Sequence, residues 1–196
     1  MGESQPQMGR QDLIAAPREL RTPRLRLEAP RAAHAAVFLE SVNRSLPGLQ
    51  FIRWGQHPHD EAWAQRFSDH DLSFVAEGGG LVFYAFEQEG GAYVGRIDLH
   101  TWDFDAPRCE VGYVGDSLTA GRGLMREAVL AVVELAFSLG VARVQALSEA
   151  DNARALHFAE YALGFTREGV LRNFERDACG RLGCQVMLAA YNPGAI

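Results

Sequence analysis

Two glycines that flank an arginine could bind an anion, because they stand directly before a long amphipathic segment. Apolar residues recur at helical spacing from Leu124 to Leu139, and Gly140 follows where a C-cap glycine is expected. A helix that begins with glycines exposes unpaired N–H groups and the positive end of its dipole, so phosphate is the expected ligand. The same glycines could instead serve only to permit a tight turn. The residues of this candidate cradle are Gly121, Arg122, Gly123, Leu124 and Met125.

The glycine pattern differs from the common nucleotide-binding motifs. No Gly-Lys-Ser/Thr follows it, so it is not a Walker loop. It also lacks the third glycine and the distal acid of a dinucleotide fingerprint. A nucleoside triphosphate and NAD are therefore disfavoured as the bound anion.

Three further motifs surround the cradle in a defined order. Glu110-Val-Gly-Tyr113 ends a predicted strand before it, Asn152-Ala-Arg-Ala155 begins a predicted helix after it, and a strand from Gly164 to Arg172 reads Gly-Phe-Thr-Arg-Glu-Gly-Val-Leu-Arg. This ordered set resembles the GCN5-related N-acetyltransferases (GNAT), and within them the RimJ/RimL-like branch that acetylates ribosomal-protein N-termini. The resemblance spans about Leu20 to Ala190.

The resemblance implies both a fold and an activity. The implied fold is α/β (α+β), with a mixed, mostly antiparallel sheet of about seven strands, helices on both faces, and two central strands that splay apart to admit the cofactor. The implied activity is direct transfer of acetyl from acetyl-CoA to a primary amine in a ternary complex, with a protein N-terminal α-amine as the first choice of acceptor. A small amine or an antibiotic is the alternative acceptor, and a non-catalytic acyl-CoA-binding module is the alternative function.

The resemblance also assigns roles to individual residues. Backbone groups of Val114 and Gly115 are expected to bind the pantetheine arm, and one such N–H would polarise the thioester carbonyl. Asn152 is expected to touch the same arm, although it could be only a helix N-cap. A protonated amine needs a base before it can attack. Glu175 is the first candidate for that base and Glu110 the second.

Two positions depart from the family pattern. Ala155 stands where RimL-like enzymes have a serine that is proposed as the general acid, and Ala159 where other members have a tyrosine in that role. The segment between Glu160 and Gly164 is about one residue longer than in the family. Tyr161 could replace the missing acid, or the thiolate could leave without one, because a thiol of pKa about 8.5 is a good leaving group.

A loop from Leu46 to Trp54 precedes a predicted helix at about Asp60 to Asp69. By resemblance this region walls the acceptor pocket and would place Phe51 and Trp54 against substrate, although large aromatic residues more often fill a core. His57, His59 and Asp60 lack a clean metal-ligand spacing, and Asp60 is better explained as the N-cap of the helix. No metal is expected.

The composition fits one globular domain. The chain has 196 residues, 47% of them hydrophobic, and a net charge of −6, which disfavours nucleic acid and suits a cationic acceptor. No apolar run approaches the roughly 20 residues of a membrane span, and three cysteines do not form a disulfide framework. We expect a cytoplasmic monomer or homodimer without membrane contact, with a mobile extension at residues 1–19 and a single acetyltransferase domain at residues 20–196.

The remaining patterns predict the elements of the sheet. Residues 24–28 alternate as a strand, and Pro30 opens a helix that reaches Ser41. Residues 81–87 and 93–102 form a hairpin, and an antiparallel strand from Arg108 follows. Residues 143–147 and 166–175 are further strands, separated by a helix.

Overall fold

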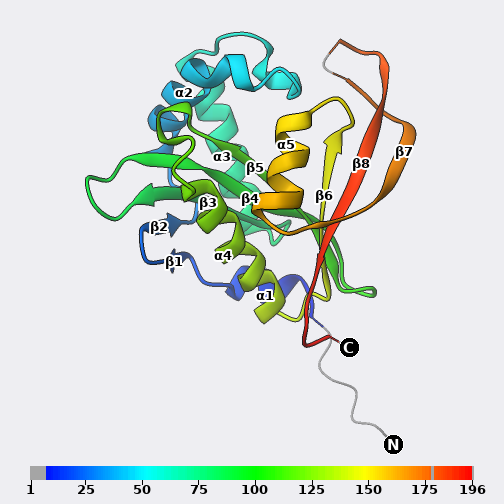
Figure 1. Cartoon of the computed structure of the whole chain (residues 1–196). Coiled ribbons are helices and arrows are strands. Elements are labelled where there is room, and N and C mark those ends of the chain that lie inside the picture. Colours follow the sequence, from blue (N-terminus) through cyan, green and yellow to red (C-terminus); the bar gives the residue numbers. More distant parts are fainter. Residues whose placement is uncertain (1–7, 178, 196) are drawn as a thin grey trace, which may run out of the picture.

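A computed structural model describes residues 8–177 and 179–195, and these residues form one mixed sheet flanked by helices (Figure 1). The strands are β1 (Glu19–Arg21), β2 (Leu25–Glu28), β3 (Leu81–Glu87), β4 (Tyr93–Asp103), β5 (Arg108–Gly115), β6 (Arg143–Glu149), β7 (Thr166–Arg176) and β8 (Leu182–Tyr191). The α-helices are α1 (Arg10–Ala15), α2 (His34–Ser45), α3 (Glu61–Ala76), α4 (Leu124–Ser138) and α5 (Ala153–His157).

The eight strands follow the order β1-β2-β3-β4-β5-β6-β8-β7. All neighbouring pairs are antiparallel except β5 and β6, which are parallel. The expected mixed, mostly antiparallel α/β sheet is confirmed, with eight strands where about seven were expected. The short strand β1 was not anticipated; it pairs with β2 through Leu20 and Leu27.

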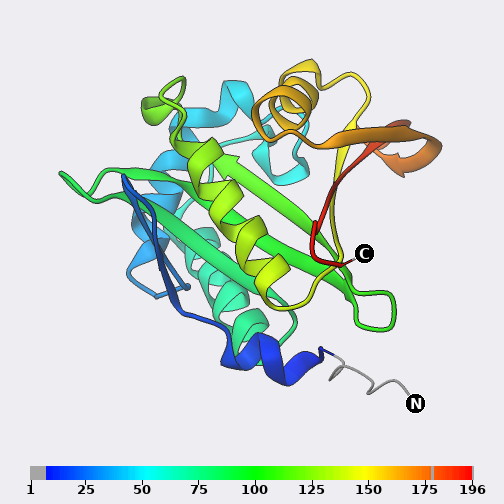
Figure 2. The ribbon, with the colours of Figure 1, turned by 60° about the horizontal axis from the view of Figure 1, so that its bottom comes forward.

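Each face of the sheet carries its own apolar layer, because side chains alternate along the strands. In β3, Leu81 and Phe83 join the layer beneath α4, whereas Val82 and Tyr84 join the layer beneath α2 and α3. Figure 2 shows α4 crossing one face while α2 and α3 cover the other. The helices predicted on both faces are therefore present.

The parallel pair β5 and β6 opens the middle of the sheet. The two strands are paired only where Arg108 to Glu110 face Arg143 to Gln145, and the remaining residues of β5 pair with β4 alone. The two strands diverge beyond this point, as the resemblance implies. One edge of β5 consequently faces an open slot.

The expectation of a mobile extension up to residue 19 is wrong for residues 8–19. Helix α1 and strand β1 lie there, and the Leu13 side chain is fully buried in the layer beneath α4. One buried leucine in a short polar segment gives no periodic signal, so only tertiary contact reveals the helix. Residues 1–7 lie outside the described residues.

Most predicted helices and turns are present with shifted ends. Helix α2 begins at His34, four residues after Pro30, and α3 continues to Ala76. The Asp60 carboxylate accepts from the Trp63 N–H at 2.8 Å, which confirms the N-cap. Two 3₁₀ turns occupy most of the predicted loop at 46–56. None of the helices in the described ranges has the length and apolarity needed to cross a membrane.

Candidate active site

A cavity of about 400 Å³ occupies the slot between β5 and β6. It brings together five of the residues predicted from the sequence: Phe51, Trp54, Glu110, Asn152 and Glu175. Other lining residues include Tyr113, Glu149, Ala155 and Ala159. A hollow of about 560 Å³ at the β4–β5 turn contains none of the predicted site residues.

The cavity reaches both faces of the sheet. On β5, Glu110 alternates with Val111, whose side chain joins the apolar layer beneath α4, so Glu110 points toward the α2 and α3 face. Tyr113 packs with the α4 layer and so lies on the opposite face. Two reactants could therefore meet in the slot from opposite sides, with Glu110 on one side and Ala155 and Ala159 on the other.

Glu110 is the more enclosed of the two predicted bases. Its side chain is 17% exposed, and it lies directly across from His100 on β4, with Nε2 of His100 3.5 Å from Oε1 of Glu110. On the other side, Nε2 of Gln145 donates to Oε2 of Glu110 at 3.4 Å. The carboxylate is thus held by groups from both neighbouring strands.

A row of alternating charges extends from Glu110 along β4. His100 Nδ1 lies 3.0 Å from Asp98 Oδ2, and the other oxygen of Asp98 contacts Arg96, which binds the fully buried Asp71 at 2.7 Å. Burial opposes the charge on His100, but hydrogen bonds and charges from Asp98 and Glu110 raise the pKa of His100 to about 9. The imidazole is therefore an imidazolium at neutral pH.

Gly112 makes room for this row. It lies directly across from Asp98, and a Cβ at position 112 would lie 3.0 Å from both carboxylate oxygens of Asp98. The glycine of the Glu-Val-Gly-Tyr motif therefore has a steric reason. Histidine and aspartate in β4 were missed from the sequence, although their spacing of two residues places them on one face.

Glu175 lies at the rim of the cavity. Its side chain is 55% exposed, and its carboxylate is 3.8 Å from Arg53. The same guanidinium donates to the Arg176 carbonyl at 2.9 Å, so Arg53 links the 3₁₀ turn at 53–56 to the end of β7. The structure places Glu175 next to the acceptor loop, but in a more exposed and cation-paired setting than Glu110.

Glu149 is a third carboxylate of the cavity, and the sequence gave no reason to select it. It ends β6, and burial together with Asp177, Asp151 and Glu175 raises the pKa of its carboxyl. No ion pair involves Glu149 among the described residues. Its position after a central strand, two residues before Asp151, is the only sequence signal that could have identified it.

The candidate phosphate cradle has the backbone that its glycines predict. Gly121 and Gly123 have φ of 76° and 73°, in the left-handed region that favours glycine. Among the described residues, the N–H groups of Gly121 to Met125 have no hydrogen-bond acceptor. They are therefore available to an anion at the start of α4.

Met125 fits because two glycines oppose it. Gly95 and Gly115 are paired across β4 and β5, and a Cβ on Gly95 would lie 2.4 Å from the Met125 sulfur. A Cβ on Gly115 would lie 2.8 Å from Cγ of Met125. The cross-strand glycine pair thus accommodates the large residue, which departs from the family pattern, and brings α4 close to the end of β5.

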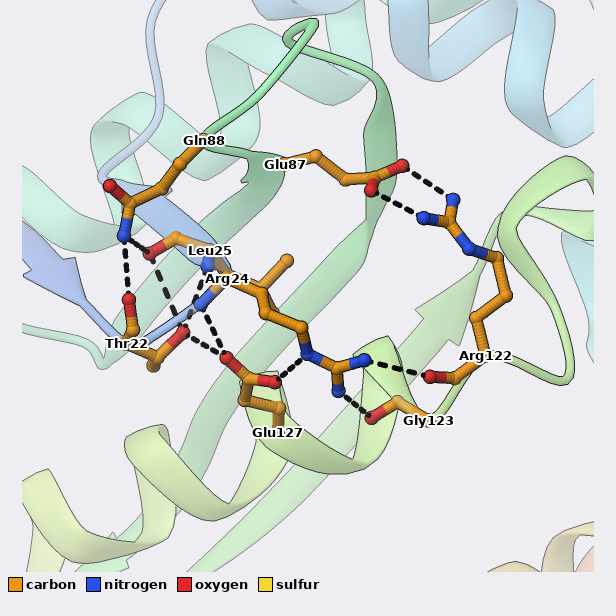
Figure 3. Close-up of polar contacts among 8 residues, drawn as sticks. All are labelled: Thr22, Arg24, Leu25, Glu87, Gln88, Arg122, Gly123 and Glu127. Atoms are coloured by element: carbon orange, nitrogen blue, oxygen red, sulfur yellow. Dashed lines mark hydrogen bonds and ion pairs between the residues drawn. The ribbon is translucent and has the colours of Figure 1, made fainter.

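A network of charges and hydrogen bonds holds the cradle from behind (Figure 3). The Arg24 guanidinium donates from Nε to Glu127 at 2.6 Å, from Nη1 to the Arg122 carbonyl at 3.0 Å and from Nη2 to the Gly123 carbonyl at 3.4 Å. Arg122 itself makes two hydrogen bonds to Glu87, at 2.6 and 2.7 Å. Both cations are therefore paired.

The helix that follows β6 explains the extra residue seen in the sequence. Asn152 Oδ1 accepts from the Ala155 N–H at 3.1 Å, so Asn152 is the N-cap of α5 as well as a lining residue of the cavity. The chain then continues as a π-helical turn at Phe158–Ala162, which is how a helix absorbs one inserted residue. Tyr161 on this turn is 76% exposed and does not line the cavity.

Tyr113 is the phenol that does line the cavity. Burial raises the pKa of Tyr113 to about 12, so it stays protonated at neutral pH. Its ring packs edge-on against Phe158, with centroids 5.3 Å apart. Trp54 serves both of its predicted roles, since it lines the cavity and also packs against Trp63 and Phe67 at 5.8 and 5.7 Å.

The comparisons with known proteins agree with this architecture. The family model described as "Acetyltransferase (GNAT) domain" matches residues 24–166. The chain therefore belongs to the GNAT acetyltransferase family. No curated protein sequence matches it significantly.

Solved structures of RimJ/RimL-type enzymes share the fold. A ribosomal L7/L12 α-N-protein acetyltransferase in complex with coenzyme A is 19% identical with a TM-score of 0.77, over 87% of this chain and 95% of that one. The microcin C7 self-immunity acetyltransferase, in complex with acetyl-CoA and AMP, is 16% identical with a TM-score of 0.78, over 87% and 93%. A ribosomal-protein-S5-alanine acetyltransferase from Vibrio fischeri is 18% identical with a TM-score of 0.72, over 91% and 98%.

Proposed function

We propose that this protein transfers the acetyl group of acetyl-CoA to a primary amine in the slot between β5 and β6, with Glu110 as the general base. The observation that carries the proposal is the cavity itself, which collects Glu110, Asn152 and the acceptor loop beside the open edge of β5. Family membership supplies the acetyl donor, since GNAT enzymes use acetyl-CoA.

The cofactor side uses backbone groups. The pyrophosphate lies on the N–H groups of Gly121 to Met125, and the pantetheine arm lies along Val114 and Gly115 as an added strand. The free edge of β5 supports this placement, since beyond Glu110 it has no partner strand within the described ranges. A backbone N–H of β5 then polarises the thioester carbonyl.

The acceptor loses its proton to Glu110. The ammonium binds the carboxylate, a proton moves from nitrogen to Oε, and the neutral amine attacks the thioester carbon. We choose Glu110 over Glu175 because it is enclosed and held on two sides, whereas Glu175 is exposed and paired with Arg53. His100 stabilises the ionised form of Glu110, which binds the cation before proton transfer.

The C–S bond then breaks and the thiolate takes up a proton. Ala155 and Ala159 line the cavity where the family pattern has a serine or a tyrosine. Tyr113 lines the same cavity and stays protonated, so its phenol is the donor we assign to the thiolate. Bulk water completes the proton balance.

The acceptor we favour is a protein N-terminal α-amine. The acidic lining of Glu110, Glu149 and Glu175 suits an ammonium group, and two of the similar structures are described as ribosomal-protein acetyltransferases. The loop with Phe51 and Trp54 would contact the first side chain of the peptide. Small amines remain the alternative acceptors.

The test is release of free thiol from acetyl-CoA with three acceptor sets: peptides that begin with serine or alanine, the same peptides with a blocked N-terminus, and a panel of small amines. Release that needs the free N-terminus supports the proposal. Release with small amines alone would reassign the acceptor. Binding of acetyl-CoA without release by any acceptor would favour the non-catalytic acyl-CoA-binding module.

A further inference from the structure

Arg24 lies behind the phosphate cradle, far from it in sequence and outside the cavity. It follows β1 and Pro23, and its side chain crosses to the first turn of α4 (Figure 3). All three guanidinium nitrogens are used: Nε contacts the Glu127 carboxylate, while Nη1 and Nη2 contact the carbonyls of Arg122 and Gly123. One side chain therefore holds two successive peptide groups of the cradle.

The two carbonyl contacts determine where the neighbouring N–H groups point. In a planar trans peptide the C=O and the N–H of the same unit point in opposite directions. Because the Arg122 carbonyl points to Arg24, the Gly123 N–H points away from it, and the Gly123 carbonyl does the same for the Leu124 N–H. These two donors face the side on which an anion would lie.

The glycines alone do not select this orientation. Glycine populates both signs of φ about equally, so Gly121 and Gly123 permit the observed left-handed backbone without enforcing it. The guanidinium supplies the missing constraint, since its planar fork binds the carbonyls and the carboxylate in one fixed arrangement.

Arg24 also neutralises a carboxylate that would repel phosphate. Glu127 stands in the first turn of α4 and also accepts from Thr22 Oγ1 at 2.5 Å and from the Arg24 N–H at 2.9 Å. Burial opposes ionisation of Glu127, but these hydrogen bonds and the Arg24 charge outweigh it and lower its pKa, so the carboxylate is charged at neutral pH. Its pairing with Arg24 leaves the anion site without a free negative charge.

We propose that Arg24 is a positioning residue of the pyrophosphate site, which orients the Gly123 and Leu124 N–H groups toward the cofactor without touching it. This inference rests on the proposed acetyl-CoA function. It assigns the work to Arg24 rather than to the Arg122 side chain, whose charge is already paired with Glu87.

The test is calorimetric titration with coenzyme A of the whole chain and of four variants. Arg24→Gln should raise the Kd for coenzyme A about tenfold. Arg24→Lys keeps the charge but cannot reach both carbonyls and the carboxylate, so it should raise the Kd at least fivefold. Arg21→Gln is the matched control, since it removes an Arg–Glu pair of 2.7 Å from the same segment without contact to the cradle, and its Kd should stay within twofold.

The double variant Arg24→Gln/Glu127→Gln separates orientation from neutralisation. If Arg24 only neutralised Glu127, the double variant would bind coenzyme A like the unaltered protein, and the orienting role would be overturned. The proposal expects its binding to stay weak. A phosphate-free donor, acetyl-pantetheine, should bind all folded variants equally, because it does not reach the cradle.

The outcomes separate the two levels of the proposal. Failure of the unaltered protein to bind coenzyme A would overturn the proposed function and this inference with it. Normal binding by the unaltered protein and also by Arg24→Gln would overturn the inference alone. If Arg24→Gln does not fold, as judged by circular dichroism, Arg24→Lys carries the same test, and a Kd within twofold of the unaltered protein overturns the role.

Discussion

The two ends of the slot treat charge in opposite ways. At the cradle, Arg24 is paired with Glu127 and Arg122 with Glu87, so the side chains around the anion site cancel. At the acceptor end, Glu149 lines the cavity without an ion-pair partner among the described residues, and its neighbours include Asp151 and Asp177. One end offers oriented backbone donors and the other offers negative side chains.

This contrast indicates how one fold can keep a donor and vary an acceptor. Backbone N–H groups depend on local geometry and tolerate many side-chain changes nearby, whereas carboxylates at the rim can be exchanged one at a time. Substitutions at the acceptor end should therefore change the rate with a given amine, and substitutions at the cradle should change the affinity for coenzyme A. The predictions below test this division, from the largest expected effect to the smallest.

Glu110→Gln should have the largest effect. Loss of the base should lower kcat about 100-fold, while the Kd for acetyl-CoA stays within twofold, because the carboxylate lies on the acceptor face. Steady-state kinetics with the best acceptor and calorimetry with acetyl-CoA would measure the two effects. Glu175→Gln is the matched comparison, and a greater loss of kcat there than in Glu110→Gln would return the role of base to Glu175.

Gly123→Ala should change the opposite end. An alanine at a φ of 73° costs about 1–2 kcal/mol and shifts the backbone, so the Kd for coenzyme A should rise about tenfold. Gly140→Ala is the control, since Gly140 also has positive φ, at 97°, but lies beyond the other end of α4. Equal affinities in the two variants would mean that the cradle geometry does not bind the cofactor.

His100 should make the stability of the protein depend on pH. Its pKa is about 9 in the folded protein and 6.5 when unfolded, so its stabilisation is complete below pH 6.5 and is lost as pH rises through 9. Because the side chain is 35% exposed, solvent screening reduces the effect to about 1 kcal/mol. Urea unfolding at pH 6 and pH 9.5 should show this loss, and His100→Gln should remove it, whereas His70→Gln, at a 74% exposed histidine, should not.

Glu149→Gln should have the smallest effect. The raised pKa of Glu149 means that its ionised form is disfavoured in the folded protein, so the neutral amide should raise Tm by about 1 °C at pH 7. The same change should raise KM for a cationic acceptor about twofold, since one carboxylate of the rim is lost. A lower Tm with unchanged KM would show that Glu149 serves only the fold.

The sequence by itself determined the parts that depend on local periodicity. The alternation in β3 to β5, the helical spacing of α4 and the glycines of the cradle each predicted the element that forms, because burial of one face needs a fixed period. The extra residue after Glu160 was also visible in the chain, although its form as a π-helical turn was not.

Only the tertiary structure decided which charges face one another. Arg24 and Glu127 are far apart in sequence, as are Asp98 and Gly112, and no local pattern pairs them. Enclosure likewise separated Glu110 from Glu175, because exposure depends on what the rest of the chain places beside a carboxylate. The sequence could therefore nominate carboxylates and a cradle, whereas the partners that tune them required the packed sheet.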